Sequence, residues 1–265
     1  MTGRRPRLAA AVIARDEEAM IGACLDSVAW ADERLVLVDA ATRDATREVS
    51  RRHGARVEER RFDHFAGQRQ AALGLADGDW VLFVDADERV TAALRDEILT
   101  TIGDPGDRVG FWIPRHNHMV GRLVRGGGWF PDEQLRLLKR GSVRFDPARV
   151  VHERALLDGP AGHLTQPFEH LSYRSLAEFV RKQEQYCRLD ARRWLATFGR
   201  PRRRALLGQP ARELWRRYVQ LQGYREGLLG LQLSVVLAWY AGKSVWLARR
   251  LSRPSVPPAG ARPLS

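Results

Sequence analysis

The chain has 265 residues, of which 44% are hydrophobic and 29% charged, so it can bury a core and is not a wholly disordered protein. Its formal net charge of +12 predicts attraction to an anionic partner or surface. Cys24 and Cys187 are too few and too far apart for a disulfide framework or a zinc site, and they indicate a reducing compartment.

The first half of the chain alternates between short apolar runs and helical patterns. Strands are expected at 7–14, 34–40, 55–62 and 79–88, and helices at 16–28, 42–54, 66–78 and 91–102. The basic start followed by "LAAAVIA" imitates a signal peptide, but the apolar run stops at Arg15, so we expect a buried strand and no export. Apolar strands between helices are typical of a mostly parallel sheet covered on both faces. The expected fold class is therefore α/β.

The second half begins with two further expected strands, 109–121 and 135–145, joined by the glycine-rich "RGGGWFPDEQ". From Ser172 onward the pattern becomes helical and basic. Between Arg181 and Arg217 there are 12 Arg or Lys residues and three acidic residues, a local balance of 12 − 3 = +9. This basic patch would attract nucleic acid or acidic lipid.

Acidic residues stand at the carboxyl ends of two of the expected strands. Asp39 ends the second strand, and Asp85, Asp87 and Glu88 follow the apolar run "VLFV". Ligands of parallel sheets bind beyond the carboxyl ends of the strands. Two carboxylates one residue apart can share Mg²⁺ or Mn²⁺, although D-x-D is short and common and a solvated loop is the alternative.

Four blocks of sequence carry a family resemblance: "VIARDEEAMIGACLDSV", "LVLVDAATRDAT", "GQRQAALGLADGDWVLFVDADE" and "GGWFPDEQLRLLKRG…VVHE". In this order, over about residues 8–155, they resemble the family 2 inverting glycosyltransferases of the GT-A (Rossmann-like) fold. Within that family the likeness is greatest to bacterial lipopolysaccharide-core β-glucosyltransferase-like proteins. One departure is "VDAATRDAT", where relatives commonly have a Gly/Ser-rich turn. The backbone there is expected to approach the nucleotide less closely, which bears on base identity and donor affinity more than on the fold.

The resemblance implies roles for five residues at a donor site. Asp39 matches the acid that binds a uracil-type base, and Arg69 a basic residue near the nucleotide. Asp85 matches a contact to ribose and metal, and Asp87 a metal ligand. His152 in "VVHE" would supply a metal nitrogen ligand or contact the diphosphate. From the residues alone, Asp39 could equally cap a helix and Arg69 could be a solvated helix residue.

Asp132 in "WFPDEQ" matches the position of the catalytic base in the same family. Its neighbour Glu133 is the competing candidate, and a turn residue is the structural alternative. The glycines 126–128 suit a mobile loop that closes Trp129 and Asp132 over the substrates, or a plain hairpin connection. His116 and His118 are treated as surface or acceptor-site residues without a metal.

The resemblance implies a cytoplasmic, metal-dependent, inverting hexosyltransferase that uses Mg²⁺ or Mn²⁺. Its donor would be a nucleotide-diphosphate sugar, expected to be a UDP-hexose, and its acceptor a cell-envelope glycolipid or saccharide. The expected domains are a catalytic domain (1–171), a helical basic region (172–253) and a disordered tail (254–265). Rival interpretations are a nucleic-acid-binding protein using the basic patch, a catalytically degenerate scaffold and a sugar nucleotidyltransferase. The last would need a glycine-rich phosphate loop that "VIARDEEAM" lacks.

The helical C-terminal region leaves two interpretations open. The apolar stretch Leu228–Gly242 is shorter than the roughly 20 residues that span a bilayer. With its tryptophans and flanking arginines it suits peripheral contact with an anionic membrane at the inner face. The alternative is a packed helical subdomain with arginine stems lying along its surface.

Overall fold

The computed structural model describes residues 4–145 and 155–252, so the predicted ligand His152 and the predicted tail lie outside the described residues. The chain divides into two compact units. The first comprises Met1–Leu123 and Phe130–Ser172, and the second Val124–Trp129 and Tyr173–Ser265. The expected boundary after residue 171 lies next to this division, but residues 124–129, expected in the first domain, belong to the second unit.

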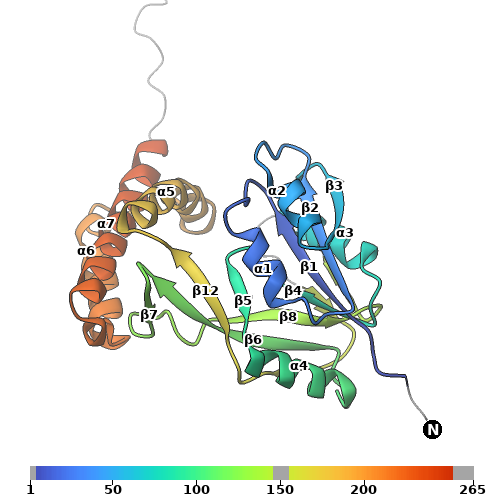
Figure 1. The fold of residues 1–265 in the computed structure, drawn as a ribbon. Coiled ribbons are helices and arrows are strands. Elements are labelled where there is room, and N and C mark those ends of the chain that lie inside the picture. Colours follow the sequence, from blue (N-terminus) through green and yellow to red (C-terminus); the bar gives the residue numbers. More distant parts are fainter. Residues whose placement is uncertain (1–3, 146–154, 253–265) are drawn as a thin grey trace, which may run out of the picture. The chain divides into compact units, whose positions relative to one another are not determined.

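A ten-stranded sheet organises the first unit (Figure 1). Its strands are β1 (Leu8–Ala14), β2 (Glu33–Asp39), β3 (Arg56–Arg60), β4 (Trp80–Phe83), β5 (Glu88–Val90), β6 (Gly110–Met119), β7 (Arg122–Val124), β8 (Glu133–Lys139), β11 (Ala161–His163) and β12 (Phe168–Tyr173). A separate hairpin pairs β9 (Val143–Phe145) with β10 (Ala155–Leu157).

The sheet is mixed, with the parallel strands β1 to β4 grouped at one side and β11 parallel to β6. The order is β3-β2-β1-β4-β8-β6-β12-β5, and β7 and β11 pair with β6. Neighbours from β3 to β4 run parallel, as expected from the βα rhythm of the first half. Beyond β4, strand β8 is antiparallel to both β4 and β6, and β12 is antiparallel to β5. The predicted α/β class is confirmed.

Helices cover both faces of the parallel strands (Figure 1). One core lies under α1 (Ile21–Ser27), α2 (Thr46–Arg52) and α4 (Ala92–Gly103) and takes alternate residues of β1, such as Leu8 and Val12. The other lies under α3 (Phe65–Leu75) and the β9–β10 hairpin and takes the intervening Ala9 and Ala11. A strand buried on both faces reads as an unbroken apolar run, which is why β1 shows no alternation.

The first predicted helix begins later than expected. It starts at Ile21, whereas the sequence pattern placed its opening at residues 16–18. The acids there bind the loop before α2 instead. Asp16 Oδ1 accepts from the Arg43 amide at 2.8 Å, and Glu18 Oε2 accepts from the Ala45 amide at 2.9 Å. The two loops at the carboxyl ends of β1 and β2 are thereby joined, which fixes the backbone around Asp39.

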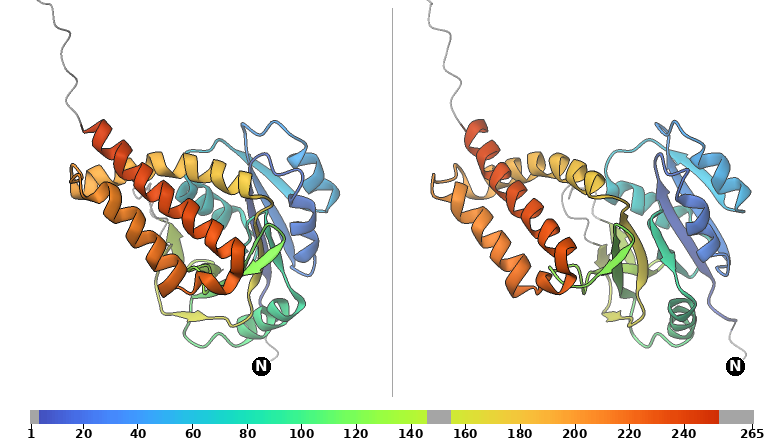
Figure 2. Two further views of the ribbon diagram at one scale, coloured as in Figure 1. Left: turned by 90° about the vertical axis from the view of Figure 1, so that its left-hand side faces the viewer. Right: turned by 60° about the vertical axis from the view of Figure 1, so that its left-hand side comes forward.

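The second unit is built around three helices (Figure 2). They are α5 (Leu176–Phe198), α6 (Ala205–Leu214) and α7 (Gly227–Leu251), with a π-helical turn, η1 (Trp215–Gln220), and a 3₁₀ turn, η2 (Gly223–Glu226), between α6 and α7. Helix α7 packs against both α5 and α6. Together with the preceding turn, α7 is long and apolar enough to cross a membrane, judged by length and composition alone. Core helices of soluble proteins share these two properties, so they do not establish a membrane span.

The glycine-rich segment 126–128 is held within the second unit. Glu226 accepts hydrogen bonds from the amides of Arg125 and Gly126 at 2.9 and 2.7 Å, and the Gly127 amide donates to the Leu221 carbonyl at 2.7 Å. The Gly126 Cα leaves no room for a side chain, because a Cβ there would lie 2.5 Å from a backbone oxygen. These glycines therefore allow close packing of this segment within the second unit.

Candidate active site

The acidic turn after β4 lies beside β8 at the carboxyl end of the parallel strands. Asp85 and Asp87 follow the buried run that ends at Val84, and the Glu88 amide closes the turn on the Asp85 carbonyl at 2.9 Å. Leu82 of β4 pairs with Leu137 of β8, so Arg136, the residue before Leu137, lies next to the acidic turn. The acids expected at the strand end are therefore present there, with a cation beside them.

Arg136 binds the first of these acids with both terminal nitrogens. Its Nη1 donates to Asp85 Oδ1 at 2.9 Å and its Nη2 donates to Oδ2, while Arg69 Nη2 of α3 lies 3.8 Å from Oδ1. Burial favours the neutral acid, yet the charges of Arg136 and Arg69 hold the pKa of Asp85 well below its usual range. Since 41% of the Asp85 side chain is exposed, its carboxylate keeps a face open to a ligand.

Glu88 contacts both Arg115 and Arg136 through its buried carboxylate. Its side chain is fully buried, and Oε1 lies 3.3 Å from Arg115 Nη1 and 3.4 Å from Arg136 Nη2. Its Oε2 accepts from the Asp85 amide at 2.9 Å. Burial raises the pKa of Glu88, opposed by Arg136 and assisted by the nearby charge of Asp85. The sequence showed Glu88 as a third acid of the turn without indicating this role.

Asp87, the second acid of the D-x-D pair, faces a histidine from β12. His170 Nε2 lies 3.3 Å from Asp87 Oδ2, and its Nδ1 is 2.6 Å from the Asn117 side-chain oxygen. The Ser172 hydroxyl donates to the same Asn117 oxygen at 2.9 Å. His170 pairs with Glu88 in the antiparallel register of β5 and β12, which places its ring beside the acidic turn.

Asp132 enters the same region from the residue before β8. Its Oδ2 accepts from Arg115 Nε and Nη2 at 2.9 and 2.6 Å and from Asn117 at 3.2 Å, and its Oδ1 accepts from Gln134 at 2.9 Å. Burial opposes ionisation, but Arg115 and these amide donors lower the pKa of Asp132. Its neighbour Glu133 points elsewhere, with Oε1 2.8 Å from His163 Nδ1.

Asp39 occupies a separate part of the strand ends. Its side chain is buried, and Oδ1 accepts from the amides of Ala41 and Phe62 at 3.0 and 3.2 Å. These amides, above all Ala41, lower its pKa, with Arg15 adding to the effect. Its Oδ2 has no hydrogen-bond donor in the described part of the chain, and the exposed Arg15 guanidinium lies 3.2 Å away. Because β1 lies between β2 and β4, Asp39 is roughly 10 Å from the D-x-D turn.

The sequence prediction missed most partners of the acids. Arg115, Asn117, Arg136 and His170 were not singled out, although each has a usable signal. Polar residues recur with a period of two within otherwise buried strands, as in Asp132-x-Gln-x-Arg136 and Arg115-x-Asn117, and such residues share one face of a strand.

The predicted residues His116 and His118 take the other face of β6. Both contact Glu169 of β12, His116 through Nδ1 at 3.2 Å to Oε1 and His118 through Nε2 to Oε2. They alternate with Arg115 and Asn117 along the strand, so they do not line the candidate site.

The site offers two metal-binding side chains close together. Over residues 4–145 and 155–252, no cluster of three or more His, Cys, Asp or Glu side chains could hold a metal ion. The pair formed by Asp87 and His170 nevertheless combines a carboxylate oxygen with an imidazole nitrogen. A divalent cation held by one or two protein ligands and completed by substrate phosphates and water fits such a pair, and the nitrogen suits Mn²⁺ better than Mg²⁺. Asp85, the other expected ligand, is bound by Arg136 and keeps part of its carboxylate exposed.

The fold and these carboxylates define an α/β protein with a ligand site at the strand ends. The family model for glycosyl transferase family 2 matches residues 10–157. The chain therefore belongs to glycosyl transferase family 2, and the family resemblance read from the sequence is confirmed.

Among curated proteins, the lipopolysaccharide core biosynthesis glycosyltransferase LpsC of Rhizobium meliloti (strain 1021) is 29% identical over 88% of both chains. An uncharacterized glycosyltransferase of Rickettsia typhi (strain ATCC VR-144 / Wilmington) is 33% identical over 33% of this chain and 30% of its own. A TPR repeat-containing protein of Synechococcus elongatus is 29% identical over 54% of this chain and 34% of its own. The chain thus spans most of the first relative but only about a third of the other two.

Solved structures are similar at a lower level. Glucosyl-3-phosphoglycerate synthase of M. tuberculosis has a TM-score of 0.46 at 18% identity, over 75% of this chain and 82% of that one. The mannosyltransferase PcManGT of Pyrobaculum calidifontis, in complex with GDP-Man and Mn²⁺, has a TM-score of 0.44 at 16% identity, over 98% and 77%. Similarity at this level concerns the fold alone.

Proposed function

We propose that this family 2 glycosyltransferase is a metal-dependent, inverting hexosyltransferase that takes its sugar from a UDP-linked donor. The acceptor we propose is a cell-envelope glycolipid or saccharide, reached from the cytoplasmic face of the membrane. The observation that carries the proposal is the meeting of the Asp87–His170 pair with the Asp132–Arg115 pair, both of which contact Asn117. One pair would bind the diphosphate through a metal, and the other would accept a proton.

The donor base is assigned to Asp39. Its Oδ2 is a buried acceptor without a hydrogen-bond donor in the described residues, next to an arginine that is mostly exposed. A buried carboxylate oxygen in this state favours a ligand that brings an N–H group. Uracil offers one at N3. Guanine offers similar donors, so GDP is the competing nucleotide.

The diphosphate is assigned to the turn after β4. Asp87 and His170 would hold a divalent cation there, which would neutralise charge on the departing diphosphate. Asp85, already ionised beside Arg136 and Arg69, would use its exposed face for the ribose or the metal. The guanidiniums of Arg69 and Arg136 add positive charge where the leaving group develops negative charge.

Asp132 is assigned as the base of the transfer step. It would take the proton of the acceptor hydroxyl while that oxygen attacks the anomeric carbon and the bond from that carbon to the diphosphate oxygen breaks. A single displacement of this kind inverts the anomeric configuration. Its lowered pKa keeps Asp132 ionised at neutral pH, so the carboxylate is always ready to accept the proton. Arg115, Asn117 and Gln134 hold it in one orientation.

The acceptor class rests on sequence similarity alone. The relative from Rhizobium meliloti, matched over 88% of both chains, is named for lipopolysaccharide core biosynthesis. A lipid-anchored saccharide acceptor would require the enzyme to work at a membrane surface. The cytoplasmic side is proposed because nucleotide sugars and reduced cysteines such as buried Cys24 belong to a reducing compartment.

The experiment that tests the donor site is calorimetric titration of the full chain with UDP, in Mn²⁺ and in EDTA. Binding that needs Mn²⁺ and is lost in Asp87→Ala supports the assignment. Binding of GDP in place of UDP would retain the family and replace the donor. Absence of binding by either nucleotide would overturn the proposed donor site.

A further inference from the structure

The face of α7 that is turned to solvent carries several large apolar side chains. Its exposed large side chains are those of Leu228 (71% exposed), Leu231, Val235, Trp239 (68%) and Trp246, whereas the buried positions include the small residues Gly230, Ser234, Ala238, Ser244 and Ala248. The spacing from Leu228 to Val235, Trp239 and Trp246 is seven, four and seven residues, which places them in one stripe. We call this set the α7 stripe.

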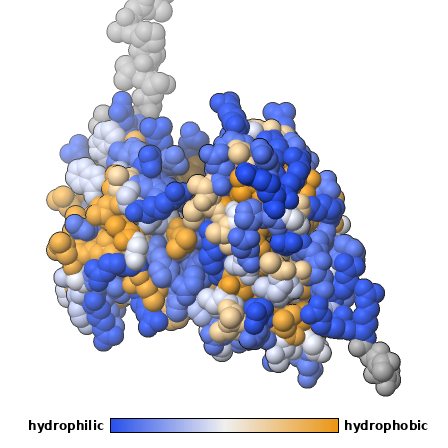
Figure 3. Space-filling view, in the orientation of Figure 1, coloured by the Kyte–Doolittle hydropathy of each residue, from blue (hydrophilic) through white to orange (hydrophobic). Residues whose placement is uncertain are grey.

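Helix α6 carries further exposed apolar side chains. Leu207 is 83% exposed, and Leu214, seven residues later on the same side of the helix, is also exposed. Figure 3 shows hydrophobic side chains gathered over α6 and α7. Scattered exposed apolar residues need no explanation, but a contiguous group rimmed by polar residues marks an interaction surface.

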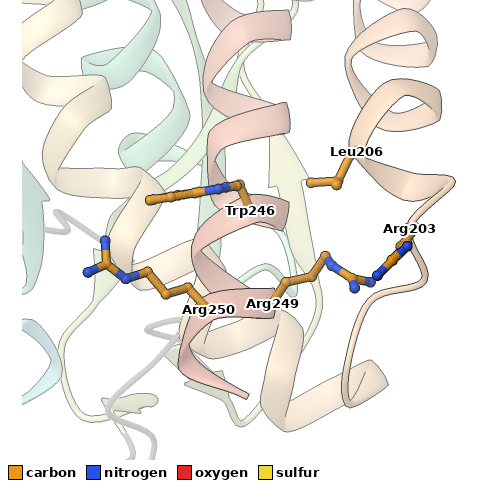
Figure 4. A pocket seen from close by; sticks show the side chains of 5 residues that line it. All are labelled: Arg203, Leu206, Trp246, Arg249 and Arg250. Carbon is orange, nitrogen blue, oxygen red and sulfur yellow. The ribbon is translucent and has the colours of Figure 1, made fainter. Parts of the chain in front are cut away.

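A basic cavity lies at one end of this apolar surface, where α6 begins and α7 ends. It has a volume of about 570 Å³ and is lined by Arg203, Leu206, Trp246, Arg249 and Arg250 (Figure 4). Arg203 and Arg249 point toward one another between the two helices. Arg249 is oriented by a hydrogen bond from Nη1 to the Pro201 carbonyl, and the Arg250 guanidinium lies 5.5 Å from the centre of the Trp246 ring.

All charged side chains that line this cavity are positive. Three guanidiniums line it and no lining residue is acidic. The guanidinium group of arginine binds phosphate through paired hydrogen bonds, and arginine is common in phosphate-binding sites. The cavity is therefore suited to a phosphate group, and Trp246 places it in contact with the α7 stripe.

We propose that the second unit binds an anionic phospholipid surface, with a headgroup phosphate in the cavity of Arg203, Arg249 and Arg250 and the α7 stripe in the lipid interface. Only an amphipathic ligand contacts both the arginine cavity and the α7 stripe. A nucleic acid or a free phosphate could occupy the cavity, but either would leave the apolar stripe exposed to water. Helix α7 lies along the interface rather than across it, because its other face is packed against α5 and α6. This inference stands on the second unit and does not depend on the transfer reaction.

The test is co-sedimentation of the full chain with phosphatidylcholine vesicles, with and without about one third phosphatidylglycerol. Binding is expected only with the anionic lipid. Each arginine near such a surface contributes on the order of fivefold to the partition constant, so Arg203→Gln/Arg249→Gln/Arg250→Gln should weaken binding roughly 100-fold. The double variant Arg203→Gln/Arg250→Gln spares the hydrogen bond of Arg249 and should weaken it roughly 20-fold.

A matched control removes three charges elsewhere. Arg181→Gln/Arg188→Gln/Arg192→Gln takes three exposed arginines from one face of α5, which is not part of the cavity. It should weaken binding only a few-fold. An equal loss in both triple variants would overturn the site in favour of general attraction by net charge. Circular dichroism and the thermal midpoint confirm that each variant is folded.

The apolar part is tested with Trp239→Gln, which changes no charge. It should lower vesicle binding at least tenfold and leave the thermal midpoint unchanged. Three results would overturn the proposal: binding of inorganic phosphate that Arg203→Gln/Arg249→Gln/Arg250→Gln loses while its vesicle binding is kept, retention in the membrane after an alkaline wash, and a dimer that Trp239→Gln dissociates while vesicle binding persists. They would indicate a free-phosphate site, a membrane span and a contact between copies of this chain, respectively.

Discussion

Arg115 of β6 lies across from Asp132, the residue before β8, and donates to a single carboxylate oxygen from Nε at 2.9 Å and from Nη2 at 2.6 Å. The strand register sets the pair, because the Arg115 amide also donates to the Asp132 carbonyl at 3.0 Å. The remaining terminal nitrogen of Arg115 reaches the buried Glu88 at 3.3 Å. One arginine therefore links the proposed base to the acidic turn that would hold the diphosphate.

Replacing Asp132 by Asn should abolish transfer without abolishing donor binding. General-base catalysis contributes roughly 10²- to 10⁴-fold, so kcat should fall by at least 100-fold while the Kd for UDP and Mn²⁺ stays within a few-fold. Glu133→Gln is the matched control, because Glu133 contacts His163 instead of the site. Full turnover by Asp132→Asn would remove Asp132 as the base.

The pH dependence of transfer should reveal the influence of Arg115 on Asp132. A lowered pKa keeps the carboxylate ionised until the pH falls below the ordinary value of about 3.9, so the acid limb of kcat/KM from this group lies below that pH. In Arg115→Met, burial of Asp132 is no longer opposed by a guanidinium, its pKa rises, and the limb moves to higher pH. Arg95→Met, at a partly exposed position of α4, should leave the profile unchanged. A limb that stays in place in Arg115→Met contradicts the assignment.

Metal-dependent nucleotide binding should need both members of the Asp87–His170 pair. Either Asp87→Ala or His170→Ala is expected to lower UDP affinity in Mn²⁺ by at least tenfold and to make it insensitive to EDTA, as measured by calorimetry. His116→Ala is the control, because that ring contacts Glu169 on the other face of β6. A His170→Ala variant with wild-type Mn²⁺ dependence would show that another group completes the metal site.

Glu88→Ala should lower the free energy of unfolding of the first unit. Removing a fully buried carboxylate leaves Arg115 and Arg136 without one of their partners, and breaking such buried pairs costs about 3–5 kcal/mol. Urea unfolding measures the change. Glu48→Ala, an exposed acid of α2, should cost no more than about 1 kcal/mol. Similar midpoints for both variants would show that Glu88 is not a structural link.

Two glycines in the second unit should respond to alanine in opposite directions. A Cβ at Gly230 would lie 1.9 Å from the Gly223 carbonyl oxygen, so Gly230→Ala must push η2 away from α7 and should cost about 1–3 kcal/mol or more. A Cβ at Gly208 in α6 meets nothing within 4 Å, so Gly208→Ala should stabilise by about 0.5–1 kcal/mol. Thermal unfolding of both variants measures the difference, and a neutral Gly230→Ala would contradict the packing of η2 on α7.

Local sequence signals located the elements of the first half well, because unbroken apolar runs have few structural alternatives. The strands and the helices near 46–52, 65–75 and 92–103 lie within a few residues of their expected positions. The opening of α1 was placed too early, because acids that commonly begin a helix here bind the neighbouring loop through Asp16 and Glu18. The sequence set no bounds for the individual C-terminal helices, and α7 (Gly227–Leu251) extends beyond the apolar stretch Leu228–Gly242.

The sequence by itself determined the α/β class, the family, the acids at the strand ends and the basic, helical C-terminal region. The individual elements and the acids follow from short local patterns, and the class and the family follow from the order of those patterns along the chain. Only the tertiary structure decided which cations meet those acids. Arg136 is 51 residues from Asp85 and His170 is 83 from Asp87, and antiparallel registers of β8 and β12 bring each pair together. A one-residue slip in either register would turn the side chain to the other face of the sheet, and no local signal fixes that choice.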